Sequence, residues 1–232
     1  MTIHTRPFRD RFEAGRVLAA ELPQYASRTD VLVFALPRGG MPVAFEVARA
    51  LRAALDVFVV RKLGAPAHEE LAMGAIASGG IRVINPSVVH LLGITQDEID
   101  EVARAEESEL SRREREYRGD RPPARVSDRT VILIDDGLAT GATMRAAAAA
   151  LRPQHPAELV VAVPVAAAET CDEFRADVDR IVCAMTPEPF RAVGLWYENF
   201  EQTTDDEVRN LLERARSFPE RPAVEPEPAR RR

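Results

Sequence analysis

The chain has 232 residues, of which 46% are hydrophobic, and a formal net charge of −6 at pH 7. This length predicts one α/β domain with a small accessory subdomain, and the acidic balance argues against general nucleic-acid binding. The charged stretch 1–11 lacks the apolar core of a secretory signal, and the longest apolar run, Leu159 to Ala168, is too short to cross a bilayer. Cys171 and Cys183 lack the spacing of a metal site and are too few for a disulfide framework, so we expect reduced thiols in a cytoplasmic protein without a membrane segment.

Phe8 to Leu22 has the apolar periodicity of an amphipathic helix, and we expect it to cover the domain. Val31 to Leu36 then predicts a buried strand. It leads into a turn with one cation and two glycines, Arg38, Gly39 and Gly40, before a helix over residues 43–55. A strand, a glycine-rich turn and a helix together can form an anion site, although many such turns only reverse the chain.

Val57 to Val60 predicts a second strand, with Arg61 and Lys62 at its carboxyl end. Two cations there suit an anion in the crevice of an α/β sheet, unless they are only solvated charges. Leu63 to Gly74 is rich in small residues, and we expect a mobile loop. Three of its residues are candidates for a role close to the chemistry, or would otherwise be solvated loop charges: His68, Glu69 and Glu70.

Two short apolar runs, 75–78 and 81–84, flank a Gly-Gly pair and predict a hairpin. Thr95 with Glu98 forms a capping box that starts a long charged helix, which continues to about Tyr117. Its apolar stripe is narrow. We expect it to pack on one seam of its own chain, and a dimer contact through that seam is the alternative.

The central stretch combines an apolar strand, Val131 to Ile134, with two acids, Asp135 and Asp136, and a small-residue turn that leads into an Ala-rich helix. Backbone N–H groups at such a helix start form an anion site, and threonine hydroxyls can add hydrogen bonds to phosphate oxygens. Carboxylates suit ribose hydroxyls or a hydrated cation. The pattern therefore predicts a site for a phosphorylated sugar. The residues of the turn that would bind the phosphate are Gly137, Ala139, Thr140, Gly141, Ala142 and Thr143.

Further strands are predicted at 159–165 and 180–184, with helices at 167–177 and 205–218. The alternation of strands and helices predicts a doubly wound, mostly parallel α/β sheet, with ligands at the carboxyl ends of the strands. The irregular stretch 185–200 could place an aromatic wall against a flat ring, or pack into a small core. The residues of this expected acceptor wall are Phe190, Trp196 and Tyr197. The Pro-, Glu- and Arg-rich end, 217–232, is expected to be disordered.

The run from Val131 to Thr143 resembles the phosphoribosyl-pyrophosphate (PRPP) motif of type I phosphoribosyltransferases, and the resemblance extends from about Phe8 to about Leu212. It is greatest to members whose acceptor substrate is unassigned. The resemblance implies the type I fold over residues 1–216. The core would span about 28–184, the small hood subdomain would span 1–27 and 185–216, and the long charged helix would be additional.

The resemblance also implies transfer of 5-phosphoribosyl from PRPP to a nitrogenous acceptor, a nucleobase or an amine, in nucleotide metabolism. Residues 139–143 would hold the 5′-phosphate. Asp135 and Asp136 would bind the ribose and, through water, a Mg²⁺ ion. The pyrophosphate would meet the 38–40 turn, which often contains a non-proline cis peptide in this family, and the cations Arg61 and Lys62. A homodimer is expected.

Members that act on 6-oxopurines carry an Asp at the position of Ala139, which disfavours hypoxanthine and guanine as acceptors. The alternative is a PRPP- or nucleotide-sensing regulatory protein of the same fold without turnover. The cations Arg38, Arg61 and Lys62 favour catalysis, because a sensor of the 5′-phosphate alone needs no pyrophosphate subsite.

Overall fold

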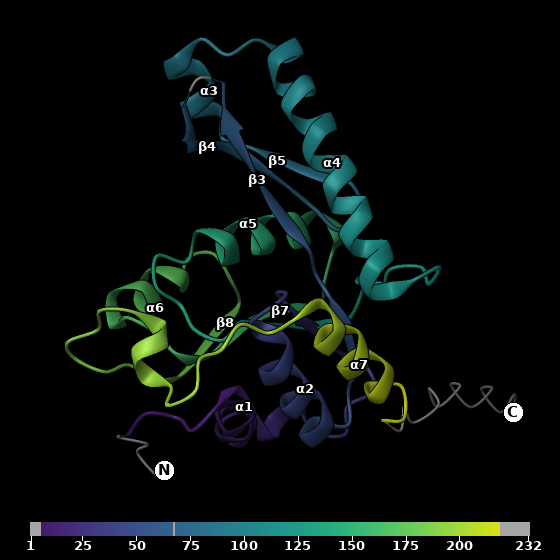
Figure 1. Ribbon diagram of the computed structural model, residues 1–232, viewed down its shortest axis with the longest axis vertical. Coiled ribbons are helices and arrows are strands. Elements are labelled where there is room, and N and C mark those ends of the chain that lie inside the picture. The colour runs from purple at the N-terminus through teal and green to yellow at the C-terminus, as the bar shows by residue number, and fades with distance from the viewer. Residues whose placement is uncertain (1–5, 67, 219–232) are drawn as a thin grey trace, which may run out of the picture.

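The structure, a computed structural model, describes residues 6–66 and 68–218, which form a body and a projecting arm (Figure 1). Within this part of the chain the body contains a five-stranded parallel sheet. Its strands are, in spatial order, β2 (Ala54–Val57), β1 (Val31–Ala35), β6 (Thr130–Ile134), β7 (Glu158–Val165) and β8 (Arg180–Met185). The mostly parallel α/β sheet expected from the sequence is confirmed.

The central strands β1 and β6 are buried along their whole length because helices cover both faces of the sheet. Alternate residues point to opposite sides, so that Val33 and Ile132 join one core and Phe34 and Leu133 the other. One face is covered by α1 (Arg11–Ala20), α2 (Gly40–Leu51) and α7 (Asp205–Ala215), and the other by α5 (Ala142–Leu151) and α6 (Ala168–Phe174) (Figure 1). Short 3-10 helices lie at Pro23–Tyr25, Arg152–Gln154 and Val193–Trp196.

The pairing register brings the carboxyl ends of the central strands to one edge of the sheet. Ala35 at the end of β1 pairs with Ile134 at the end of β6, and Ile134 pairs with Ala162 of β7. The turns that follow β1 and β6 therefore start side by side, where ligands bind in open α/β sheets.

The arm is a three-stranded antiparallel sheet packed against a long helix (Figure 1). Its elements are β3 (Val60–Ala65), β4 (His68–Ala77), β5 (Ile81–Ile84), α3 (Pro86–Leu92) and α4 (Gln96–Arg118). The expected hairpin around Gly79–Gly80 is confirmed, because both glycines adopt positive φ between β4 and β5.

Two expectations about this segment are wrong. The stretch expected as a mobile loop pairs as β3 and β4, from Val60 opposite Ala77 to Ala65 opposite His68, because the small residues alternate with buried ones such as Leu63 and Met73. Arg61 and Lys62 lie within β3 of the arm and not at the carboxyl end of a parallel strand. The second parallel strand, β2, ends earlier than expected, at Val57.

The long helix α4 begins with the expected capping box, in which the Thr95 hydroxyl accepts from Glu98 N–H and the Glu98 carboxylate accepts from Thr95 N–H. Its apolar stripe, including Ala103, Leu110 and Tyr117, is buried within the chain's own core. The seam is therefore used inside the chain and is not the exposed dimer contact that was the alternative.

The expectation of two reduced cysteines is also wrong in this structure, which joins Cys171 of α6 to Cys183 of β8 in a disulfide. Their Cα atoms are 6.8 Å apart, because α6 packs directly on the strand that follows it. The two residues lie in the core beneath α5 and α6.

The expected disordered end lies mostly outside the described residues, which stop at Phe218. Phe218 itself packs on Phe45 of α2, with ring centroids 5.2 Å apart, so the ordered part of the chain extends slightly beyond the predicted boundary. In the described residues, no helix has the length and apolar character needed to cross a membrane.

A buried ion pair ties the end of α4 to the body. Arg118, whose side chain is 4% exposed, donates to Asp56 at 2.9 Å and to Glu114 at 2.7 Å. We expect Arg118→Met to lower the free energy of unfolding by about 3–5 kcal/mol, because it leaves the carboxylates of Asp56 and Glu114 near the core without their cation. Urea denaturation measures the change.

The matched control is Arg112→Met on the same helix, where the arginine side chain is 59% exposed and pairs with Glu109 and Glu116. Exposed pairs contribute about 0–1 kcal/mol, so this variant should unfold nearly like the wild type. Equal losses in the two variants would show that the arm is not anchored through Arg118.

Candidate functional site

Two acids follow β6 and lie directly against the turn that follows β1. A Cβ atom on Gly39 would lie 2.2 Å from Asp136 Oδ2, and one on Gly40 would lie 2.7 Å from the carbonyl oxygen of Ile134. Glycine is therefore required at both positions by close approach. The structure thus brings together two of the three segments predicted from sequence, the 38–40 turn and the acid pair.

The turn after β1 contains a cis peptide bond between Pro37 and Arg38, the non-proline cis bond expected for this segment. It leads directly into α2, whose first residue is Gly40. The backbone here therefore starts a helix beside the two acids.

Asp136 is held at both its side chain and its backbone. Arg11 Nε donates to Asp136 Oδ2 at 2.8 Å, and the Tyr197 hydroxyl donates to the Asp136 carbonyl oxygen at 2.5 Å. Burial raises the pKa of the Asp136 carboxyl above its usual value, and the Arg11 guanidinium opposes that shift. Arg11 comes from α1 and Tyr197 from beyond β8, so both ends of the chain meet at this residue.

Asp135 is bonded differently from its neighbour. Its Oδ1 accepts from the Asp136 N–H at 2.8 Å, and among the described residues its Oδ2 has no hydrogen-bond partner. Burial, and then repulsion from Asp136, raise the pKa of the Asp135 carboxyl well above its usual range. Such a strongly perturbed group with a free oxygen is typical of a ligand site.

The turn from Gly137 to Thr143 presents its backbone amides. Leu138 N–H is bonded to the Val165 carbonyl, but within the described structure the amides of residues 139–143 have no hydrogen-bond partner. No side chain caps α5, whose N-cap is Gly141 at φ +72°. Unsatisfied amides at a helix start, with the exposed Thr140 and Thr143 beside them, are the arrangement that anion sites commonly use, and the phosphate site stays a prediction.

The same turn is supported from behind by α6. The Thr170 hydroxyl donates to the Ala139 carbonyl at 2.8 Å. A Cβ atom on Gly141 would lie 2.4 Å from the Phe174 ring, so this glycine is required both by its positive φ and by close packing. The Ala139 carbonyl of the turn is thereby bonded to α6.

The predicted cations have acidic partners in this structure. Arg38 lies 3.6 Å from Asp205 at the start of α7, and Arg61 lies 2.6 Å from Glu106 on α4. Asp205 also accepts from the Tyr117 hydroxyl at 2.5 Å. Burial, and then this hydrogen bond to the carboxylate, raise the pKa of Tyr117. An anion at this site would compete with these carboxylates for the two guanidinium groups. Lys62 is exposed on β3.

The structure does not bring the predicted loop residues to the acids. His68 is exposed at the start of β4, and the side chains of Glu69 and Glu70 lie outside the described part. Figure 1 shows this end of the arm, near α3, standing away from the body.

The predicted aromatic wall is mainly a small core. Tyr197 is 6% exposed and packs on Phe8 with ring centroids 5.6 Å apart, while Phe190 and Trp196 pack half-buried against the same cluster. The Tyr197 face is therefore not available to an acceptor ring. Phe200, 38% exposed and 5.0 Å from Tyr197 between ring centroids, is the aromatic residue here that sequence analysis missed.

Arg11 was also missed, although the sequence carries a signal for it. It is the first residue of α1, where a cation opposes the helix dipole and is locally unfavourable. An arginine at such a position is explained when its charge is needed elsewhere, here by Asp136.

The raised pKa of Asp135 predicts how its removal changes stability with pH. Ionising a carboxyl whose folded-state pKa lies above the unfolded value of about 3.9 costs folding free energy. That cost is fully present above the folded-state pKa and disappears as the pH falls below the unfolded value. We therefore expect Asp135→Asn to raise Tm at pH 8 by a few degrees, since about 1 kcal/mol corresponds to about 2–4 °C in a chain of this size.

The gain should shrink steadily toward pH 4 in thermal unfolding followed by circular dichroism. Asp120→Asn, at an exposed position, is the control and should change Tm little at any pH. A gain from Asp135→Asn that is constant with pH would contradict the assigned cause.

Comparison with known proteins gives the family. A sequence model of the phosphoribosyl transferase domain matches residues 9–195. A curated Mycobacterium tuberculosis protein, recorded from two strains and named "Putative phosphoribosyl transferase", is 45% identical over 219 residues. The match covers 94% of this chain and 49% of that protein, so the chain spans about half the length of the curated relatives it matches.

A solved structure of similar length shows the same fold. The protein TT1426 from Thermus thermophilus superposes with a TM-score of 0.80 at 40% identity, over 90% of this chain and 98% of that one. The matched sequence includes the acid pair and the open turn after β6. The chain therefore belongs to the phosphoribosyl transferase family.

Proposed function

We propose that this protein transfers the 5-phosphoribosyl group of PRPP to a nitrogenous acceptor and releases pyrophosphate. The observation that carries the proposal is the turn at residues 139–143, whose amides lack partners in the described structure while Asp135 presents a free carboxylate oxygen nearby along the chain. Amides at a helix start suit the 5′-phosphate, and a carboxylate suits ribose hydroxyls.

The pyrophosphate would lie at the 38–40 turn, where close backbone approach and Arg38 suit an anion. Arg61 and Lys62 follow β2 by a few residues, and we propose that they complete this subsite from the arm. Glu106 and Asp205 then act as counter-ions that give way to pyrophosphate, because a multiply charged phosphate attracts a guanidinium more strongly than a single carboxylate.

The proposed reaction breaks the bond from the ribose C1 to pyrophosphate and forms a bond from C1 to a nitrogen of the acceptor. Cationic character would develop on the ribose ring, and the negative charge of the carboxylates at positions 135 and 136 would stabilise it. Fixing the 5′-phosphate and the pyrophosphate at two separate turns would orient C1 for attack.

Magnesium suits this donor set. Among the described residues no group of three or more His, Cys, Asp or Glu side chains is arranged to hold a metal. Mg²⁺ commonly uses one or two carboxylates together with water and substrate phosphates, so Asp135 and Asp136 can hold it through water. When bound, the ion would neutralise charge on the departing pyrophosphate.

One departure from the family pattern narrows the range of possible acceptor substrates. Ala139 carries no acid at the position from which 6-oxopurine enzymes serve the base, so we propose an acceptor other than hypoxanthine or guanine. Phe200 is exposed and stacks on Arg11, which contacts Asp136, and we propose that Phe200 borders the acceptor in place of Tyr197.

Calorimetric titration with PRPP and Mg²⁺ tests the substrate. Wild type should bind, and Asp135→Asn/Asp136→Asn should lose at least about 100-fold in affinity, because the site loses the negative charge of both carboxylates. Asp97→Asn/Glu101→Gln, on the exposed side of α4, is a control with the same charge change and should bind like wild type. Indifference to the change at 135 and 136 would contradict the proposal.

A screen of nucleobases and amines by thermal shift, with PRPP and Mg²⁺ present, should identify the acceptor, because a ligand that binds the native state raises Tm. Compounds that raise Tm are then tested for pyrophosphate release. Release with one of them, but not with hypoxanthine or guanine, is the expected result. PRPP binding without release for any acceptor would instead support the sensing function.

A homodimer and a cytoplasmic location remain predictions. The buried seam of α4 is not the dimer contact, and the chain's match to only half of its curated relatives leaves the activity of the whole protein as a proposal.

A further inference from the structure

The two acids after β6 differ in what surrounds them. Asp136 Oδ2 is contacted by Arg11 on one side and would touch any Cβ on Gly39 on the other. Its side chain is only 16% exposed. Asp135 keeps Oδ2 without a partner in the described structure. The second acid is therefore occupied by the protein itself.

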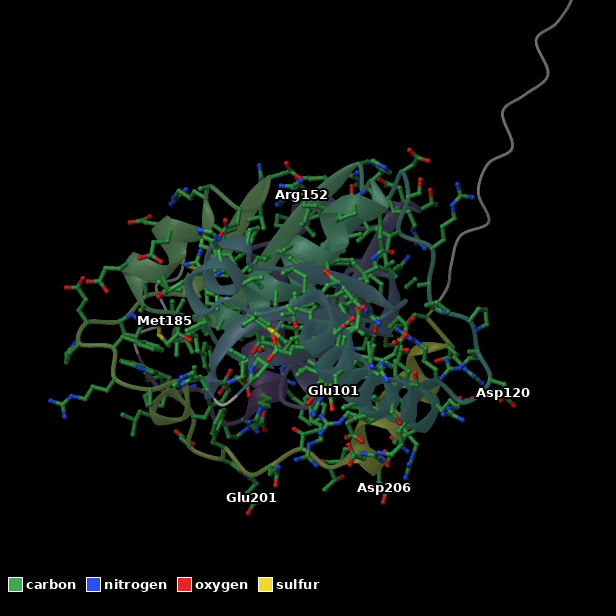
Figure 2. The ribbon with its side chains drawn as sticks, turned by 90° about the horizontal axis from the view of Figure 1, so that it is seen from above. Glu101, Asp120, Arg152, Met185, Glu201 and Asp206 are labelled. Carbon is green, nitrogen blue, oxygen red and sulfur yellow. A yellow bond between two sulfur atoms is a disulfide. The ribbon has the colours of Figure 1, made fainter. Side chains whose placement is uncertain are left out.

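The Arg11 side chain is fixed by three contacts at once. Besides its bond to Asp136, the guanidinium donates from Nη1 to the Glu201 carbonyl at 2.6 Å and lies 3.9 Å from the centre of the Phe200 ring. The side chain is 10% exposed. The Glu201 carboxylate points away from the body, so only its backbone takes part (Figure 2). A planar guanidinium suits this combination of two hydrogen-bond acceptors and one aromatic face.

The contacts of Arg11 join segments from both ends of the chain. Backbone bonds connect the segment before α1 to the segment after β8: Phe8 N–H to the Trp196 carbonyl at 2.8 Å, Glu198 N–H to the Phe8 carbonyl at 2.7 Å, and Asn199 N–H to the Arg9 carbonyl at 2.9 Å. This pair of segments, 8–11 and 196–201, is the hood strap. Arg11 and Tyr197 attach the hood strap to Asp136 and thereby to the end of β6.

We propose that Arg11 is a positioning residue that locks the hood strap onto Asp136, and that Asp135 is the carboxylate that meets the ribose. The second half of this inference rests on the proposed function, whereas the first half concerns the protein without ligand. The acid pair is thus divided: one member closes the hood and the other serves the substrate.

Arg11 compensates the negative charge of Asp136. Without Arg11, the Asp136 carboxylate would lie uncompensated against Gly39, beside the turn proposed to bind pyrophosphate. Like charges at such short range repel strongly in a partly buried site. Removing the Asp136 charge should therefore relieve the defect that removal of Arg11 creates.

Affinity for PRPP with Mg²⁺, measured by calorimetry on a set of variants, tests this. We expect Arg11→Met to weaken binding about 100-fold and Arg11→Met/Asp136→Asn to recover about tenfold of that loss, because contacting charged groups couple by such amounts. Asp136→Asn alone, which keeps an oxygen to accept from Arg11, should lose no more than about tenfold, against about 100-fold for Asp135→Asn. Arg9→Met, whose side chain is 66% exposed beside the same helix start, is the control and should bind within about twofold of wild type.

The lock itself is tested without ligand through Trp196, the single tryptophan of the chain and part of the hood strap. Arg11→Met should raise the rate of acrylamide quenching of its fluorescence about twofold or more, and Arg9→Met should not, provided that circular dichroism shows both variants folded. A variant that does not fold is replaced by Arg11→Lys, which keeps the charge, loses the fork geometry and should show a smaller effect in the same direction.

The possible outcomes separate the two claims. If the wild type binds no PRPP, the proposed function fails and with it the role of Asp135. Acrylamide quenching of Trp196 then tests on its own whether Arg11 locks the hood strap. If the wild type binds and Asp136→Asn is as damaging as Asp135→Asn, or the double variant is no better than Arg11→Met, Asp136 contacts the substrate directly and the division of the pair is wrong. Unchanged quenching in Arg11→Met overturns the lock.

Discussion

Two carboxylates in sequence at the end of a buried strand are the constraint around which the rest of the site is arranged. Each is costly to ionise where water is scarce, and each makes the other costlier. One guanidinium, that of Arg11, bonds Asp136 and compensates its negative charge. Asp135 keeps a raised pKa and, among the described residues, one carboxylate oxygen without a hydrogen-bond partner. The hood strap, the glycines at 39 and 40 and the N-terminal helix are all arranged around this pair. The site therefore remains poorly compensated in charge, as expected where a ligand supplies hydrogen-bond donors or a cation.

The remainder of the site follows from the register of the parallel sheet. Pairing of Ala35 with Ile134 makes the turns after β1 and β6 neighbours, so the turn proposed to bind pyrophosphate lies beside the acids, and the turn proposed to bind the 5′-phosphate begins a few residues further along the chain. The arm continues from β2 and carries Arg61, paired to Glu106 of its own helix. The family match covers all three of these regions, since it spans residues 9–195.

Much of this was readable from the sequence, for physical reasons that differ by segment. Buried parallel strands such as Val131–Ile134 are continuous apolar runs, and capping boxes such as that of Thr95 are local, so both were predicted correctly. The stretch 63–74 was not, because its glycines and alanines read as a loop while cross-strand pairing with 60–65 decides its structure. Arg11, Phe200 and the Cys171–Cys183 pair depend on contacts between distant segments, and no local pattern encodes such contacts. The aromatic stretch 190–197 was compatible with either a ligand wall or a small core, and most of its aromatic side chains pack into the core.

The central claim is that the amides of residues 139–143 bind the terminal phosphate of a sugar. Backbone amide NMR of the 15N-labelled protein, titrated with ribose 5-phosphate, tests this most directly, with unphosphorylated ribose as the comparison. The account predicts large downfield shifts of these amides, saturating with ribose 5-phosphate and absent with ribose, because a charged phosphate oxygen replaces water as acceptor. Saturable binding that leaves these amides unshifted, or no binding of ribose 5-phosphate, would contradict it.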